Sequence, residues 1–357
     1  MSDYLKYFDK FVFIVIIIIS LSGILLIYSV SQSLDQSYYL KQLLWLSVSL
    51  IAFFIVLRLK TEFVFRSGLT LCVILSIILT IQLIAGQVVS GTKSWIKFGF
   101  VGIQVSEFIK IPIALCIANI LSKTRIIDWF IFCKLIFLLG IPFLLIAVQP
   151  DLGTAFILTS FIIISVLLKR IRLSIIFVSI MFVIIGSFLS WNHILKPYQK
   201  NRITSFFNPE KYSQSSGYQI IQSKIAIGSG GLNGKGYLKG SQSKYKFLPT
   251  RHTDFVGSVL GEEFGFIGVS FLFLLFFILF YRQFNFKSKT DKEFYFVYLF
   301  NFLILFQFLI NVLMSIGLFP ILGIPLPFVS YGGSSLLSFF IGEAIIFKIK
   351  INNYLEI

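Results

Sequence analysis

Residues 11–30 read FVFIVIIIISLSGILLIYSV and contain no charged side chain. A helix that spans a bilayer needs about 20 mostly apolar residues, and this run has that length. It is too long for the apolar part of a signal peptide, and no cleavage pattern of small residues follows it. We therefore interpret it as the first membrane-spanning helix.

The same pattern returns along the chain. The 13% share of charged residues is about half that of a soluble domain, and the mean hydropathy is +0.91. We predict an all-α polytopic membrane protein with about ten transmembrane helices, built as a single integral membrane domain over residues 1–357. The predicted spans are 8–30, 40–58, 67–86, 105–122, 130–148, 152–168, 173–190, 259–281, 293–316 and 334–348.

The net charge of +16 is explained by Lys and Arg at the ends of these spans, so a nucleic-acid partner is not expected. Positive charges favour cytoplasmic loops, which predicts that both termini are cytoplasmic. The three cysteines lie in or beside apolar runs and have neither disulfide nor metal-site spacing. The basic positions predicted to be inside are Arg58, Lys60, Arg66, Lys123, Arg125, Lys169, Arg170, Arg172, Arg282, Lys287, Lys289, Lys292, Lys348 and Lys350.

One segment breaks the pattern. Residues 191–258, between the seventh and eighth predicted spans, are polar and rich in Gly, Lys and Arg. A loop of this length crosses the membrane largely regardless of its charge, so we predict a large extracytoplasmic loop. It is the expected working surface of a membrane enzyme.

Two ionisable residues interrupt the fourth predicted span. Glu107 and Lys110 are three residues apart and would share a helix face. Charges within a span are costly and usually face a cavity or each other. They either line a cavity for an anionic ligand or form a structural ion pair. Trp95, just upstream, is either a cavity residue or an interfacial anchor.

Residues 149–155, QPDLGTA, form a predicted hairpin at the outer face. Asp151 is placed to cap the helix that follows, and capping is the better explanation of this residue on spacing alone.

Residues 228–236, GSGGLNGKG, have the composition of a phosphate-binding turn, with Lys235 inside it. The order of residues is not that of the Walker A nucleotide-binding motif. Backbone N–H groups of such a turn can bind a pyrophosphate oxygen. A tight turn that needs positive φ explains the glycines equally well.

Residues 247–255, FLPTRHTDF, end the polar segment. Partial desolvation at a membrane boundary raises the pKa of a carboxylate and suits Asp254 to general-base catalysis. A helix cap is the alternative role. Arg251 would oppose the rise in pKa, and His252 is better explained as a hydrogen-bonded structural histidine.

Residues 320–335, PILGIPLPFVSYGGSS, cannot form a continuous helix because of their Pro and Gly residues. Irregular backbone at membrane depth is tolerated where protein buries it or where it lines a cavity. Glu343, near the inner end of the last span, is expected to extend towards water rather than to function.

Seven blocks together resemble one family, the SEDS proteins (shape, elongation, division and sporulation), from about residue 90 to the end of the chain. The GSGGLNGKG and RHTDF forms resemble the elongation, RodA-like branch more than the division, FtsW-like branch. Val105, the pair Lys93-Ser94 and Thr250 depart from the family's usual pattern, and none of these departures affects Asp254. The blocks are GTKSWI, QVSEFIK, QPDLGTA, GYQIIQSKIAIGSGGLNGKG, FLPTRHTDF, GEEFGFIG and GIPLPFVSYGGSS.

This resemblance implies ten transmembrane helices and an inverting peptidoglycan glycosyltransferase in the bacterial cytoplasmic (inner) membrane. Such enzymes polymerise lipid II, as donor and acceptor, and work with a class B penicillin-binding protein and the elongation machinery. The family's essential aspartate falls on Asp254, and its cavity residues fall on Trp95, Glu107 and Lys110. The other motif positions are Gln149, Asp151, Gln222, Ser223, His252, Ser330, Tyr331, Gly332 and Gly333.

The chemistry of the substrate adds further candidates. Positive charge must stabilise the departing pyrophosphate, for which Lys110, Arg202, Arg251 and Lys235 are available. A divalent cation, Mg²⁺ or Mn²⁺, is the one cofactor that the reaction could use. The competing interpretations are a lipid II flippase, a secondary transporter and a non-catalytic scaffold. The motifs favour the enzyme because they cluster on outer loops.

Overall fold

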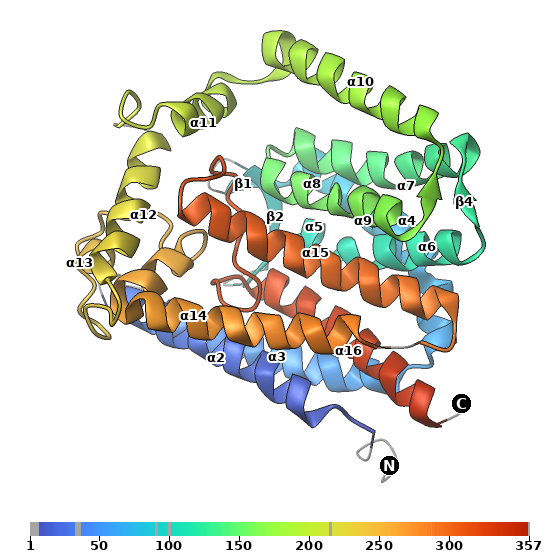
Figure 1. The fold of residues 1–357 in the computed structure, drawn as a ribbon, viewed down its shortest axis with the longest axis horizontal. Coiled ribbons are helices and arrows are strands. Elements are labelled where there is room, and N and C mark those ends of the chain that lie inside the picture. Colours follow the sequence, from blue (N-terminus) through green and yellow to red (C-terminus); the bar gives the residue numbers. More distant parts are fainter. Residues whose placement is uncertain are drawn as a thin grey trace.

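The computed structural model describes residues 7–32, 37–89, 92–98, 101–213, 216–286 and 288–355 (Figure 1). Each apolar run predicted from the sequence forms helix. The first seven runs correspond to α2 (Lys10–Ser31), α3 (Tyr38–Arg58), α4 (Thr61–Ala85), α5 and α6 (Val105–Phe108 and Lys110–Ser122), α7 (Trp129–Val148), α8 and α9 (Leu152–Leu158 and Ser160–Leu168) and α10 (Leu173–Leu189). The last three are α14 (Val256–Phe284), α15 (Asp291–Ser315) and α16 (Gly333–Leu355).

Within the described residues, eight helices are long and apolar enough to cross a membrane. The apolar helix Leu152–Leu168 is shorter, and α16 carries Glu343, Lys348 and Lys350 along its length. With these two, the count approaches the predicted ten. The chain is therefore a multi-pass helical membrane protein, as the sequence predicts.

Acidic side chains begin several helices. Asp9 accepts a hydrogen bond from the backbone N–H of Val12 at the start of α2, and Asp128 accepts one from Ile131 at the start of α7. Such caps satisfy backbone donors that a helix leaves unpaired at its first turn. α4 begins six residues before its predicted start. Its first turn is polar, with an exposed ion pair between Glu62 and Arg66, so the apolar pattern used for the prediction did not include it.

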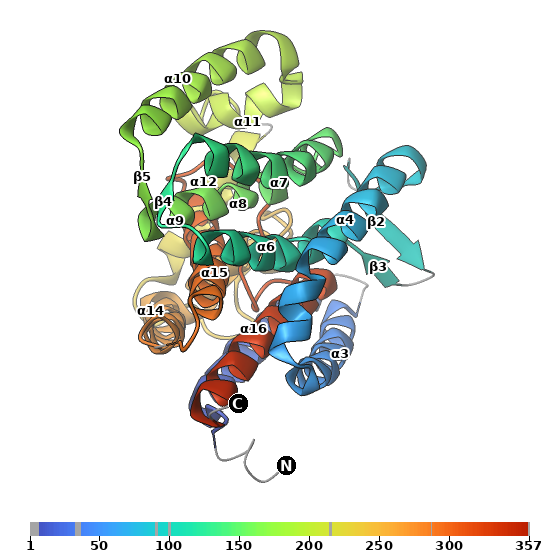
Figure 2. The same cartoon turned by 90° about the vertical axis from the view of Figure 1, so that its right-hand side faces the viewer.

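α6 and α15 lie at the centre of the bundle and pack against each other (Figures 1 and 2). α16 packs along α3, and α14 packs along α2. α10 is different, since it stands apart from the rest of the bundle at the top of both views and is almost entirely exposed. Its surface is apolar on all sides, as expected of a helix surrounded by lipid.

The polar segment 191–258 is more ordered than predicted. It holds a π-helical turn (Ser190–Ile194) and the helices α11 (Pro197–Phe207), α12 (Ser216–Gly230) and α13 (Ser241–Lys244). Pro197 stands at the first position of α11, where its missing N–H costs nothing. On α12 the buried residues Ile220, Ser223 and Ala226 recur every three positions and form the face that packs on α14.

Short strands were not predicted. β1 (Gln87–Val89), β2 (Thr92–Phe98) and β3 (Val101–Ile103) form an antiparallel sheet between α4 and α5. β4 (Ile126–Ile127) and β5 (Arg170–Ile171) form a parallel pair. These segments are too short to show a period of two in the sequence.

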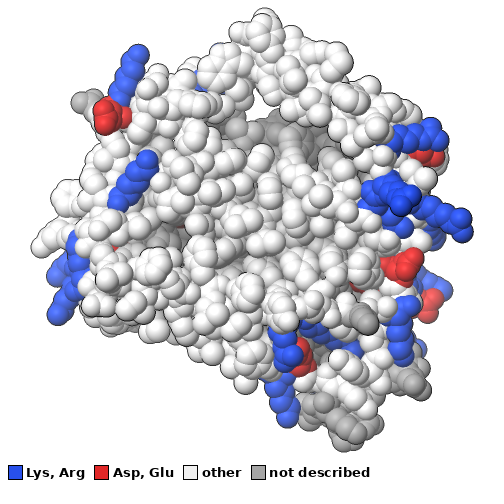
Figure 3. Space-filling view, viewed as in Figure 1, with Lys and Arg blue, Asp and Glu red and all other residues white. Residues whose placement is uncertain are grey.

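The charges divide the molecule into two ends. On the face in Figure 3, Lys and Arg gather near α12 and α13 on the left, and on the right near both termini, with a broad uncharged band between them. The termini lie side by side: the rings of Tyr7 and Tyr354 stack with centroids 5.5 Å apart, and Asp9 lies 3.7 Å from Lys350. An even number of spans fits this arrangement.

Candidate active site

Asp254 lies in a tight turn directly before α14. The carbonyl oxygen of Thr250 accepts the backbone N–H groups of Thr253 and Asp254, both at 3.0 Å. Asn311 on α15 then fixes the turn, since its Nδ2 donates to the carbonyl oxygens of Asp254 (2.8 Å) and Ile324 (2.7 Å). One side chain thus joins the end of the polar segment to the last outer connection.

The carboxyl group of Asp254 does not cap α14. The N-cap position is Phe255, and no side chain caps this helix end. Gly323 adopts φ +73° next to the carboxylate, where a Cβ atom would lie 3.6 Å from Oδ2 of Asp254. The geometry therefore disfavours the capping alternative and leaves the carboxylate beside a residue without a side chain.

Burial raises the pKa of Asp254 to about 6. Hydrogen bonds from the hydroxyl groups of Thr253 and Thr250 and the positive charge of Arg202 work against this rise, and the charge of Asp151 adds to it. Arg202 lies on α11, so the interaction brings three distant parts of the sequence together. A carboxylate with this pKa is ionised at neutral pH and is a stronger base than an exposed one.

Asp151 caps α8, as the sequence predicts. Its Oδ1 accepts the N–H of Thr154 at 3.2 Å, and its Oδ2 accepts Nε2 of Gln104 at 2.7 Å. Burial raises its pKa, and the charge of Glu107 raises it further. Besides capping α8, Asp151 interacts electrostatically with two other carboxylates: the charge of Glu107 raises its pKa, and its own charge raises the pKa of Asp254.

Glu107 and Lys110 form an ion pair of 2.9 Å and are almost completely buried, with 3% and 1% of their surfaces exposed. Lys110 also donates to Oε1 of Gln307 on α15 at 3.3 Å, and its ammonium lies 5.7 Å from the ring centre of Phe339. These contacts favour a structural ion pair over a cavity for an anionic ligand. It also places Lys110 against Glu107, so its charge is already neutralised.

The last outer connection is attached to the Asp254 turn. Ser330 donates to the carbonyl oxygen of Thr253, and the N–H of Tyr331 donates to the carbonyl oxygen of His252 at 2.8 Å. Gln42 on α3 bonds the N–H of Gly332 at 3.2 Å. Gly333 lies so close to the indole of Trp45 that no Cβ atom would fit. Ser330 and Tyr331 thus hold the Asp254 turn in place, and Gly332 and Gly333 pack this connection against α3.

His252 lies in an aromatic cluster, stacked on Tyr38 with ring centres 4.7 Å apart and close to Tyr331. Burial lowers its pKa to about 4, and the neighbouring charge of Arg251 adds to the effect. The imidazole is therefore neutral at physiological pH. Arg251 is itself buried, and desolvation lowers its pKa.

The glycine-rich turn is closed on itself. Gly231, Gly234 and Gly236 have positive φ, and the N–H groups of 234, 235 and 236 donate to the carbonyl oxygens of 230, 262 and 263. The ammonium of Lys235 lies 2.8 Å from Oε1 of Glu262. These backbone donors are already used, which favours the tight-turn alternative over a phosphate cradle.

Of the remaining predicted positions, two are buried in the bundle and two are only partly buried. Ser223 bonds Ser258 on α14 and the carbonyl of Ser315 on α15, while Gln222 beside it is half-buried. Gln149 is buried and donates to the carbonyl of Leu79 at 2.9 Å. Trp95 lies on β2 against Gly102.

Glu343 contradicts its prediction. It is fully buried and accepts a hydrogen bond of 2.6 Å from Gln283 on α14, rather than extending to water. A polar partner on a neighbouring helix explains why it can stay inside.

Sequence reasoning missed Asn311 and Gln307, which hold Asp254 and Lys110 respectively. Both lie on α15, four residues apart and on one face. Amides inside an apolar span are themselves a signal of a polar interior, and this spacing could have identified them.

Comparison with known proteins identifies the family. The family model of the FtsW, RodA and SpoVE cell cycle proteins matches residues 7–355. Peptidoglycan glycosyltransferase MrdB of Escherichia coli K12 is 36% identical over 285 residues, which cover 77% of this chain and 76% of that protein. The probable peptidoglycan glycosyltransferase FtsW of Wigglesworthia glossinidia brevipalpis is 34% identical over 98% of this chain and 96% of its own.

A solved structure agrees with these matches. A chain from a study of how a peptidoglycan synthase complex coordinates polymerization and crosslinking superposes with a TM-score of 0.82 at 26% identity. The match covers 97% of this chain and 98% of that one. The protein therefore belongs to the FtsW, RodA and SpoVE family of cell cycle proteins, the SEDS family.

Proposed function

We infer that this chain is a peptidoglycan glycosyltransferase that polymerises lipid II into β-1,4-linked glycan strands for cell elongation and shape. The observation that carries the proposal is Asp254, a partly buried carboxylate that caps no helix and whose pKa is raised to about 6. Its turn is fixed by Asn311 and Ser330, and Arg202 lies within electrostatic reach. A base and a cation held together at one site suit glycosyl transfer.

The reaction is a single inverting displacement. Asp254 takes the proton from the 4-hydroxyl of the acceptor sugar, and that oxygen attacks the anomeric carbon of the donor. The bond from this carbon to the lipid pyrophosphate breaks, and undecaprenyl pyrophosphate leaves. Arg202 and Arg251 stabilise the negative charge that develops on the leaving group. Lys110 contributes less because Glu107 neutralises it.

We propose that a divalent cation binds only when the pyrophosphate of the substrate is present to complete its site. The described residues contain no group of three or more His, Cys, Asp or Glu side chains able to hold a metal ion. Mg²⁺, however, is commonly bound by one or two carboxylates plus substrate phosphates. Asp254 and Asp151, which are coupled electrostatically, are the carboxylates that would hold it, where it would neutralise the pyrophosphate.

The proposed location is the bacterial cytoplasmic membrane, with both termini cytoplasmic and residues 191–258 outside. Among the short connections, those on the side of the termini carry more Lys and Arg than those on the opposite side, which supports this orientation. The proposed partner is a class B penicillin-binding protein of the elongation machinery, which would crosslink the strands. The structural match to a chain from a peptidoglycan synthase complex supports that choice.

Cysteine labelling tests the orientation. Tyr245 is 67% exposed on the polar segment, and Lys289 is exposed at the opposite end, whereas Ser241 is bonded to Lys235 and Glu262 and is a poor site. In a Cys133→Ser background, Tyr245→Cys should react with a membrane-impermeant maleimide in intact cells, and Lys289→Cys should react only after lysis. The reverse pattern would place Asp254 on the side without extracytoplasmic substrate.

Purified protein incubated with lipid II, with and without a class B partner, tests the activity. We expect a ladder of glycan polymer on a gel, and none from Asp254→Asn prepared in parallel, which excludes a contaminating polymerase. Transfer of lipid II across liposomes without polymer would favour the flippase instead. A silent protein that still activates its partner would favour the scaffold.

A further inference from the structure

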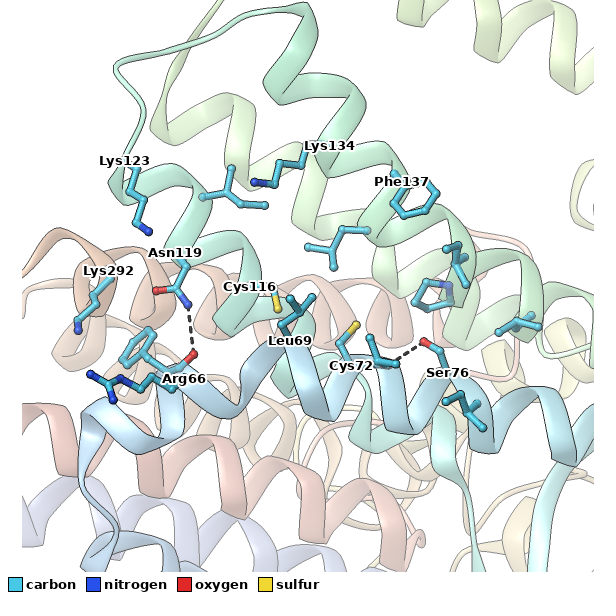
Figure 4. A pocket seen from close by; sticks show the side chains of 18 of the residues that line it. Arg66, Leu69, Cys72, Ser76, Cys116, Asn119, Lys123, Lys134, Phe137 and Lys292 are labelled. Atoms are coloured by element: carbon cyan, nitrogen blue, oxygen red, sulfur yellow. Dashed lines mark hydrogen bonds between the residues drawn. The ribbon is translucent and has the colours of Figure 1, made fainter.

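One groove in the described structure is lined by none of the candidate active-site residues. It has a volume of about 780 Å³ and runs between α4, α6 and α7 (Figure 4). Its walls are apolar, and Leu69, Ile77 and Phe137 are each more than half exposed along it. The groove therefore opens sideways to the membrane.

α7 forms one wall of the groove. Pro142 lies inside this helix and lines the groove together with Leu138, four residues earlier. Proline cannot donate to the carbonyl of residue i−4, so α7 lacks one of its backbone hydrogen bonds at the wall of the groove. From Arg66 to Thr80 the groove follows α4 for about 21 Å at 1.5 Å per residue. That exceeds one leaflet of a hydrocarbon core about 30 Å thick, so an acyl chain fits.

Four cations gather at one end of the groove. Figure 4 shows Lys123 and Lys134 on one side and Arg66 and Lys292 on the other. Glu62 is the one carboxylate in the lining, and it is paired with Arg66 at 2.8 Å. Lys292 is held 5.4 Å from the ring centre of Phe65. Within the described part of the chain, the ammonium groups of Lys123, Lys134 and Lys292 form no hydrogen bond or ion pair.

We propose that this groove is a binding site for an anionic phospholipid, with its phosphate among Lys123, Lys134 and Lys292 and an acyl chain between α4 and α7. Three cations without a carboxylate partner favour a headgroup with net negative charge over a zwitterionic one. Under the proposed orientation these residues are at the cytoplasmic end, so the lipid belongs to the inner leaflet. This separates it from a substrate that reacts at the outer face.

Native mass spectrometry of the delipidated full-length protein in detergent tests the site. It is titrated with phosphatidylglycerol, with phosphatidylethanolamine of the same acyl chains, and with glycerol 3-phosphate as a headgroup without chains. We expect one phosphatidylglycerol to bind at least about tenfold more tightly than phosphatidylethanolamine, and glycerol 3-phosphate not to compete. Equal binding of the two lipids, or competition by glycerol 3-phosphate, overturns the proposal.

Two matched variants locate the binding. Lys123→Gln/Lys134→Gln/Lys292→Gln should weaken phosphatidylglycerol binding at least about tenfold. Arg58→Gln/Lys60→Gln/Arg172→Gln removes the same charge from exposed positions at the same end but outside the groove, and should bind within about twofold of the unmodified protein. An equal loss in both variants would mean that general surface charge attracts the lipid, and the site would be disproved.

Two further variants guard against indirect effects. The triple Lys→Arg variant at 123, 134 and 292 keeps the charges and should retain the lipid. Ser76→Trp fills the apolar wall without touching the charges and should displace it. Retention by Ser76→Trp with a normal melting temperature would place the lipid elsewhere. The readout is bound lipid mass, so the result is independent of whether the chain polymerises lipid II.

Discussion

Asp254 and Glu262 are eight residues apart, yet their carboxylates have opposite surroundings. Glu262 is fully buried, and its oxygens accept hydrogen bonds from Lys235, Ser241 and the N–H groups of Gln242 and Ser243. Asp254 is only half-buried, and its carboxylate is hydrogen-bonded mainly by threonine hydroxyls. Its pKa is raised to about 6. A carboxylate with saturated hydrogen bonds fastens two segments together, whereas one left short of donors is prepared to accept a proton.

Replacing the two carboxylates by amides should give opposite results. Asp254→Asn removes the base and should reduce polymer synthesis by about 10²–10⁴-fold at unchanged folding. Glu262→Gln, assayed at equal folded concentration, should polymerise lipid II within a few-fold of the unmodified enzyme. Gel quantification of glycan from purified proteins measures both. An active Asp254→Asn enzyme would remove the catalytic assignment.

The pH dependence of the rate examines the same contrast. Asp254 is protonated below its raised pKa of about 6, and a protonated carboxyl cannot act as a base. Polymerisation should therefore be nearly constant above pH 7, half-maximal near pH 6 and about tenfold lower for each pH unit below that. His252 is already neutral throughout this range, so it should not contribute. An acid limb centred near pH 4 would contradict the role of Asp254.

The free energy of unfolding should fall when Glu262 is replaced and should change little when Asp254 is replaced. Glu262→Gln leaves Lys235 without its counter-charge and weakens a set of buried donors, which should cost about 1–3 kcal/mol of unfolding free energy. Lys235→Met should lose stability as well, and the double variant should lose less than the sum because the two residues share one interaction. Thermal unfolding in detergent measures these changes. Asp254→Asn should melt at nearly the normal temperature.

Arg202 should have a smaller effect on the rate than Asp254. Its positive charge lowers the pKa of Asp254, so Arg202→Gln should move the acid limb of the rate profile to higher pH. Arg202→Lys keeps the charge and should restore most of the original position. A rate that falls without any shift of the limb would mean that Arg202 contacts the leaving group but does not influence the base.

The predicted cavity role of Glu107 and Lys110 can be separated from a structural one. Removing one partner of a buried ion pair is strongly destabilising, by about 3–5 kcal/mol, whereas replacing both can be nearly neutral. Glu107→Gln/Lys110→Met should therefore fold better than either single variant. If that double variant also polymerises lipid II at the normal rate, the pair serves the fold alone.

The ten apolar runs, their helical state and their approximate ends could be predicted from the sequence because lipid leaves a backbone no other way to satisfy its hydrogen bonds within one segment. Asp151 as a helix cap and Asp254 as the candidate base were also predictable, the first from its local spacing and the second from its position and family motif. These features depend on residues that are close together in the sequence, so the sequence alone is enough to predict them.

Tertiary structure decided the rest. Only the folded chain shows that Asn311 joins the Asp254 turn to Ile324 and that the charge of Arg202 acts on Asp254. It also shows that Glu262 pairs with Lys235 and accepts the N–H groups of α13. The partners in the hydrogen bonds and the ion pair are between 13 and 57 residues apart, and the electrostatic interaction with Arg202 joins α11 to the turn before α14. Whether a carboxylate is saturated with donors or left short of them depends on which distant groups packing brings to it, and no local pattern encodes that.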